Sequence, residues 1–180
     1  MKSILISIRP EWVERILNGE KTIEVRKSAP RCDLPVEVYI YCTKGGNILY
    51  APNGYNEHYW TQKYGPLKRD LRGKVLAKFM LDEIYEYQIE DKHTWEDPHF
   101  EETTQKLMGM GLDELHNYVG DKTFYGWHIS DLEIFDEPME LERFEYTNPS
   151  GIVTISQRSL WGLPSKKHPP QSWCYVEVKE

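Results

Sequence analysis

The segment SIRPEWVERILNGEKTIEVRK, residues 7–27, contains a helix signal followed directly by a strand signal. Pro10 fits the first turn of a helix, where its missing N–H costs nothing, and Glu11 suits the positive end of the helix. Asn18-Gly19 tolerates the left-handed backbone that ends many helices. The apolar residues between these signals fall on one face: Trp12, Val13, Ile16 and Leu17. The pattern predicts a short amphipathic helix that begins at Pro10.

The residues after this helix alternate between apolar and polar side chains, as a half-buried strand does. Ile23 and Val25 point one way, and Thr22, Glu24 and Arg26 point the other. Two residues along a strand span roughly 6.6 Å, so Glu24 and Arg26 can contact one ligand or pair with each other. Because Lys21 lies at the turn into this row, the segment predicts a recognition site for a polar, planar ligand.

Four motifs in order carry a resemblance to a known family. GEKTIEVR, residues 19–26, preceded by the strand pattern ILISI at 4–8, resembles the opening motif of the ASCH domain family. GKVLAKF at 73–79, LDELHNY at 112–118 and YGWHI at 125–129 resemble the family's later strand, helix and strand. ASCH domains are similar to PUA domains, which are small β-barrels associated with RNA. The resemblance therefore implies an α+β fold: a PUA-like mixed β-barrel with short flanking helices.

The resemblance also suggests how the chain is divided. Residues 1–145 are expected to form the ASCH/PUA-like domain, and 146–180 a C-terminal extension packed on it, with an added strand at 174–178. Within the domain, 43–72 is predicted to be a long aromatic-rich insertion, because Gly and Pro pairs mark turns along it. Its aromatic residues and the basic residues that follow suit single-stranded nucleic acid, but they equally suit an insertion pinned to the barrel.

Aromatic residues on three predicted elements are candidates for either the core or the binding site. Strand 36–42 alternates strictly, which predicts an outward-facing Tyr41 that either stacks on bases or packs across strands. In the helix at 112–119, Tyr118 is expected in the core. Gly126 in the strand at 123–130 predicts a bulge or a close approach to the backbone. Trp127 or His128 would then line the barrel mouth beside Lys21, unless Trp127 is simply packed.

Composition limits the function classes. The formal net charge of −7 argues against non-specific binding to phosphates, although six basic residues gather at 63–78 and nine acidic ones at 82–102. Three cysteines without a C-x-x-C pair and six histidines without ligand spacing predict free thiols, no metal and no cofactor. No apolar run approaches about 18 residues, so we expect a cytoplasmic protein with no membrane partner.

The first functional hypothesis is a module that binds RNA, a nucleotide or a modified nucleoside. Lys21 would meet a phosphate or a base acceptor, Arg26 would offer a planar pair of donors, and Glu24 would accept from an exocyclic amine. Arg9, Trp127 and Tyr41 complete the predicted ligand-binding set. A purely structural or protein-interaction role is a further alternative.

The second hypothesis is a hydrolase. Some small ASCH proteins act on acetylcytidine, and the resemblance suggests a catalytic Lys, a Thr three residues later and a Glu near the second helix. Lys21 matches, whereas Glu24 stands at the Thr position and Thr22 lies next to Lys21. Met108 falls near the Glu position, where Glu101, Glu102 or Glu114 could substitute. If the chain is an enzyme acting on a modified nucleoside or on RNA, the predicted catalytic residues are Lys21, Glu24 and Thr22.

Overall fold

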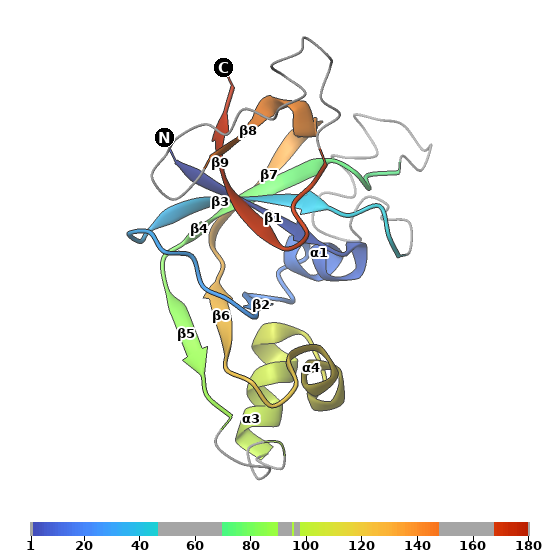
Figure 1. The fold of residues 1–180 in the computed structure, drawn as a ribbon. Helices are drawn as coiled ribbons and strands as arrows, with labels where there is room; N and C mark the ends of the chain where they lie inside the picture. The colour runs from blue at the N-terminus through green and yellow to red at the C-terminus, as the bar shows by residue number, and fades with distance from the viewer. Residues whose placement is uncertain (1, 47–69, 90–94, 96–97, 148–167, 180) are drawn as a thin grey trace.

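The computed structural model describes residues 2–46, 70–89, 95, 98–147 and 168–179 (Figure 1). Most of the predicted insertion, with all its aromatic residues, lies outside the described residues, as do residues 148–167 of the predicted C-terminal extension. The elements in chain order are β1 (Ser3–Ile8), α1 (Pro10–Leu17), β2 (Ile23–Arg26), β3 (Val36–Cys42), β4 (Val75–Leu81), β5 (Ile84–Tyr87), α3 (Pro98–Thr103), η2 (Thr104–Met108), α4 (Leu112–Val119), β6 (Phe124–His128), β7 (Ser130–Met139), η3 (Leu141–Arg143), β8 (Phe144–Thr147) and β9 (Trp173–Val178).

The described strands form two sheets. One has the order β7-β4-β3-β1-β9-β8, and the other has the order β2-β6-β5. The α+β class is confirmed, but no closed barrel is present in the described part of the chain. The chain passes from the larger sheet to the smaller one between β4 and β5, and returns between β6 and β7. Among the described strands, β7 and β8 are the edges of the larger sheet and β2 and β5 those of the smaller, and no strand pairing joins these edges. Figure 1 shows the smaller sheet below the larger one, next to the helices.

The opening segment folds as its pattern predicts. α1 begins at Pro10 and buries Val13, Ile16 and Leu17 against the larger sheet, while Trp12 is only partly buried. Gly19 has a φ of 76°, the left-handed conformation that lets the chain turn out of the helix. The chain then enters β2, whose four residues are all buried.

Both faces of the larger sheet are covered by apolar residues. On β3, Val38 and Ile40 belong to one core, whereas Tyr39 and Tyr41 belong to a second core that includes Phe144. Tyr41 is only 3% exposed, and the Tyr39 ring lies edge-on to Phe144 at 5.0 Å between centroids. The prediction that Tyr41 faces outward is wrong, because residues of β7, η3 and β8 pack on the face that the alternation assigned to solvent. Of its two interpretations, the structure supports packing.

The smaller sheet packs on the helical segment 98–119 through a third core, formed by Ile23, Val25, Met108, Met110, Leu115, Val119 and Phe124. Gly126 on β6 lies close to side chains of the two neighbouring strands, Ile23 on β2 and Tyr87 on β5. A Cβ at this position would come within 2.8 Å of Ile23 Cγ2 and 3.0 Å of Tyr87 Cε2. The predicted close approach to the Gly126 backbone is therefore confirmed.

The last strand, β9, lies inside the larger sheet between β1 and β8, and pairs antiparallel with both. Within the part of the chain that the structure covers, no helix has the length and apolar character needed to cross a bilayer. Over the same residues, His, Cys, Asp and Glu form no group of three or more that could hold a metal ion.

Candidate functional site

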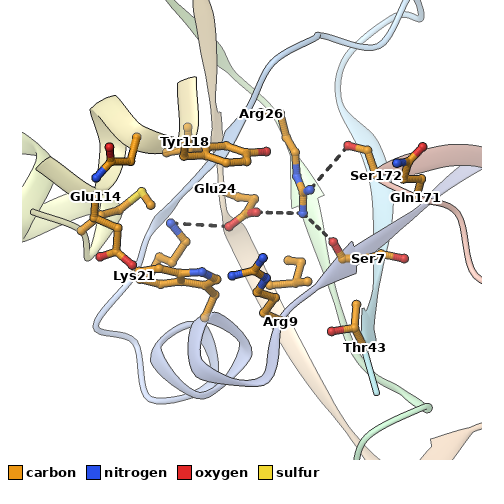
Figure 2. A pocket seen from close by; sticks show the side chains of 15 residues that line it. Ser7, Arg9, Lys21, Glu24, Arg26, Thr43, Glu114, Tyr118, Gln171 and Ser172 are labelled. Carbon is orange, nitrogen blue, oxygen red and sulfur yellow. Dashed lines mark hydrogen bonds and ion pairs between the residues drawn. The ribbon is translucent and has the colours of Figure 1, made fainter. Parts of the chain in front are cut away.

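A cavity of about 540 Å³ opens where the two sheets meet, and both sheets contribute to its wall (Figure 2). The end of β1, the start of α1, β2 and one face of α4 all reach it. Its lining residues are Ser7, Ile8, Arg9, Trp12, Lys21, Glu24, Val25, Arg26, Thr43, Met110, Glu114, Asn117, Tyr118, Gln171 and Ser172. The volume lies within the roughly 300–1,000 Å³ typical of small-ligand pockets.

Three charged side chains form a continuous chain of ion pairs along this wall. Glu24 Oε1 lies 2.8 Å from Arg26 Nη2, and Glu24 Oε2 lies 3.5 Å from Lys21 Nζ. The exposed fractions are 2% for Lys21, 5% for Glu24 and 7% for Arg26. Because burial removes most of the screening by water, these charges act strongly on one another and on any ligand that enters. Figure 2 shows the three side chains converging between α4 and β1.

Lys21 is aimed inward by the turn between α1 and β2. Its backbone N–H donates to the Arg15 carbonyl at 3.1 Å, and its Nζ donates to the Met108 carbonyl at 2.6 Å. Burial lowers the pKa of Lys21 below its ordinary value of 10.5, Glu24 opposes this shift, and Arg26 and Arg15 add to it. Arg15 itself donates to the Gly109 carbonyl, so two cations hold the end of η2.

Arg26 connects the two sheets. From β2 in the smaller sheet, its Nη2 donates to the Ser7 carbonyl on β1 at 2.8 Å, and its Nη1 lies 3.5 Å from Ser172 Oγ. Its Nε is buried without a hydrogen-bond partner among the described residues. Arg26 therefore has an unused donor although most of its guanidinium is engaged.

Aromatic rings flank the charged chain. Tyr118 is 38% exposed, and Lys27 Nζ lies 4.9 Å from its ring centroid. The expectation that Tyr118 is a core residue is wrong, because α4 buries Leu115 and Val119 and turns Tyr118 to the cavity. Trp12 lies on the cavity wall as well, with Lys21 Nζ 5.5 Å from its ring.

Four of the predicted site residues meet at this cavity: Lys21, Glu24, Arg26 and the exposed Arg9, whose Nη1 is 3.9 Å from Glu11 Oε1. The other three do not line it: Thr22, Tyr41 and Trp127. Thr22 is held by its backbone, which bonds to Leu107 and Ile129. Trp127 is fully buried against Trp173, because its side of β6 faces the larger sheet.

The sequence interpretation missed several lining residues. Glu114, Asn117 and Tyr118 are spaced i, i+3 and i+4 on α4, which puts them on one helix face, and this spacing was a usable signal. Glu114 was one of the acids considered, and it does line the cavity. Gln171 and Ser172 have no local signal, since tertiary contacts bring them to the site: the Ser7 N–H donates to the Ser172 carbonyl at 2.8 Å, and the Ser7 hydroxyl donates to the Pro170 carbonyl at 2.7 Å. His128, 2.8 Å from Asp82, lies outside the lining.

Comparisons with known proteins agree with this architecture. The crystal structure of ASCH from Zymomonas mobilis superposes with a TM-score of 0.57 at 17% identity, covering 97% of this chain and 87% of that one. A mutant of the same Zymomonas mobilis protein gives 0.56 at 17% identity, with coverage of 98% and 91%. At this identity the likeness shows the fold alone. No curated protein matches the chain. The family model described as the ASCH domain matches residues 6–152, and the chain therefore belongs to the ASCH domain family.

Proposed function

We propose that this protein binds RNA or a nucleotide by taking a base or modified nucleoside into the cavity between its sheets. ASCH domains are generally associated with RNA, which supports this class of ligand. The observation that carries the proposal is the chain of three buried charges, Lys21, Glu24 and Arg26, along a cavity wall. Burying such charges costs desolvation free energy that apolar side chains do not cost, and arrangements of this kind concentrate at functional sites.

The geometry suits recognition of one ligand better than coating of a backbone. The cavity offers a carboxylate acceptor, two cationic donors and neutral polar side chains, with Tyr118 available for stacking. The whole chain carries a net charge of −7, so affinity for phosphates alone would be weak. Selective contacts inside the cavity therefore supply the binding free energy.

Calorimetric titration with ribonucleoside monophosphates and a short single-stranded RNA tests this function. Arg26→Met is expected to weaken binding about ten-fold or more, because a hydrogen bond to a charged group is lost. Lys78→Met is the matched control, since Lys78 pairs with Glu37 and Glu133 and does not line the cavity. Equal affinity of Arg26→Met and Lys78→Met, with both variants folded, would contradict the proposal.

A hydrolase acting on a modified nucleoside such as acetylcytidine, or on RNA, is the second candidate, and one observation favours it. The lowered pKa of the buried Lys21 makes its neutral form more accessible, and a neutral amine can accept a proton from an attacking water. Because Thr22 does not line the cavity, water is the nucleophile that this geometry supports. Turnover of acetylcytidine or an RNA oligonucleotide that disappears in Lys21→Met, with the variant shown to be folded by circular dichroism, supports the hydrolase, and absence of turnover in the unmodified protein excludes it.

A further inference from the structure

The hydrogen-bonding capacity of the cavity wall points to one base. Glu24 takes part in ion pairs through both of its oxygens, and an ionised carboxylate only accepts hydrogen bonds. We infer that the cavity selects guanine, an inference that depends on the proposed nucleotide-binding function. Guanine alone among the common bases presents two neighbouring N–H donors beside a carbonyl acceptor on its pairing edge.

The number of hydrogen bonds that Glu24 can accept from a ligand follows from its lone pairs. An ionised carboxylate has about four lone-pair positions on its two oxygens. Arg26 occupies one at Oε1, and Lys21 occupies one at Oε2. One position therefore remains on each oxygen, which is the arrangement that a pair of N–H groups needs. In guanine, N1–H and the 2-amino group supply that pair.

The hydrogen-bond donors of the cavity wall lie on Lys21 and Arg26, the two residues that pair with Glu24. Lys21 Nζ has three N–H groups, and it uses one on the Met108 carbonyl and one on Glu24. Arg26 Nε is buried without a partner among the described residues. A donor thus remains on each side of Glu24. The carbonyl O6 of guanine, adjacent to N1–H, can accept from one of them, so the wall carries both the acceptors and the donor that this edge of guanine needs.

The other bases leave a mismatch at Glu24. Adenine and cytosine each place a ring nitrogen lone pair beside their amino group, and this lone pair would face the Glu24 carboxylate. Uracil has one N–H between two carbonyl oxygens, so one of these oxygens would face the carboxylate as well. A buried acceptor opposite another acceptor costs the unmade hydrogen bond and adds repulsion. Stacking on Tyr118 favours every base and does not change this order.

The test varies the ligand, so that protein stability cannot confuse it. Titrate the unmodified protein with the 5′-monophosphates of guanosine, inosine, adenosine, cytidine and uridine. Inosine is the sharpest comparison, because it lacks only the 2-amino group of guanosine. We expect guanosine monophosphate to bind roughly ten- to 150-fold more tightly than inosine monophosphate, the ratio expected for one hydrogen bond to a charged acceptor.

Two protein variants then test which residue is responsible for the preference for guanosine monophosphate. Glu24→Gln, confirmed folded by circular dichroism, is expected to bring guanosine and inosine monophosphate to within about three-fold of each other, because an amide has only one acceptor oxygen. Tyr118→Ala should weaken all five nucleotides by a similar factor and leave their ratio unchanged.

The outcomes separate the two proposals. Equal affinity for guanosine and inosine monophosphate, or tighter binding of any other base, overturns the guanine inference and leaves nucleotide binding in place. If neither the five nucleotides nor single-stranded RNA bind, the proposed function is overturned and the inference falls with it. A guanosine preference that persists in Glu24→Gln also overturns the role given to Glu24.

Discussion

Glu24→Gln provides the most direct test of the site's physics, because it removes the carboxylate that bonds to two buried cations. Lys21 and Arg26 are then 2% and 7% exposed, with no other carboxylate of the described residues in contact. Removing one partner of a buried ion pair typically costs about 3–5 kcal/mol, because the remaining charge is left uncompensated. We expect a decrease of that size in the free energy of unfolding at neutral pH.

The loss of unfolding free energy in Glu24→Gln should depend on pH, and the pKa of Lys21 sets the direction of this dependence. Its pKa is lowered in the folded protein, so the folded state releases this proton first, and stability rises with pH between the lowered pKa and 10.5. Without Glu24, which opposes the shift, the pKa falls further and the rise begins at lower pH. The gap between variant and unmodified protein therefore narrows as the pH increases from neutral.

Urea unfolding followed by circular dichroism measures both effects. The matched control is Glu37→Gln, which breaks an equivalent pair of 2.9 Å to Lys78 in which both side chains are over a quarter exposed. Surface pairs contribute about 0–1 kcal/mol, so this control should change little. A double variant that adds Lys21→Met should recover stability by removing one unpaired charge. Similar losses in Glu24→Gln and Glu37→Gln, or a gap that does not change with pH, would refute the reasoning.

Three further substitutions test other parts of the structure. Gly126→Ala should lower the free energy of unfolding by roughly 1–3 kcal/mol, because its Cβ meets Ile23 and Tyr87 at 3.0 Å or less; an unchanged urea midpoint would contradict this packing. Tyr118→Ala should weaken nucleotide binding by about 1–3 kcal/mol in calorimetry without lowering the melting temperature, since the side chain is proposed to stack on the base and is not in the core. Thr22→Ala should leave affinity and any turnover within about two-fold, because Thr22 does not line the cavity; a large loss of turnover would restore it as a nucleophile.

The part of the site that the sequence predicts is the part encoded locally. Pro10, the Asn18-Gly19 stop and the alternation that follows place Lys21, Glu24 and Arg26 together within six residues, so no tertiary information was needed. The close approach to Gly126 also has a local signal in the sequence. A glycine inside an aromatic strand often marks a place where another group packs against the backbone.

The errors arise where a second layer of structure decides burial. Alternation on β3 separates two faces, but it does not reveal whether the second face meets water or another core, and Tyr41 meets a core. The same limit applies to Trp127, whose face of β6 packs on the larger sheet, and to Tyr118, whose helix has a narrower buried stripe than its apolar residues suggest. Whether a barrel closes depends on whether the edge strands of the two sheets pair with each other, and the sequence motifs do not encode this pairing.

The charges that are proposed to bind a ligand also hold elements of the fold together. Arg26 bonds across to Ser7 on β1 in the other sheet, and Lys21 bonds to the Met108 carbonyl at the end of η2. Substituting either cation changes recognition and architecture together, and a loss of binding in such a variant is ambiguous by itself. Tyr118 lines the cavity without contributing to these links, and comparing bases on the unmodified protein leaves the links intact. These two approaches therefore separate what the site recognises from what holds the fold together.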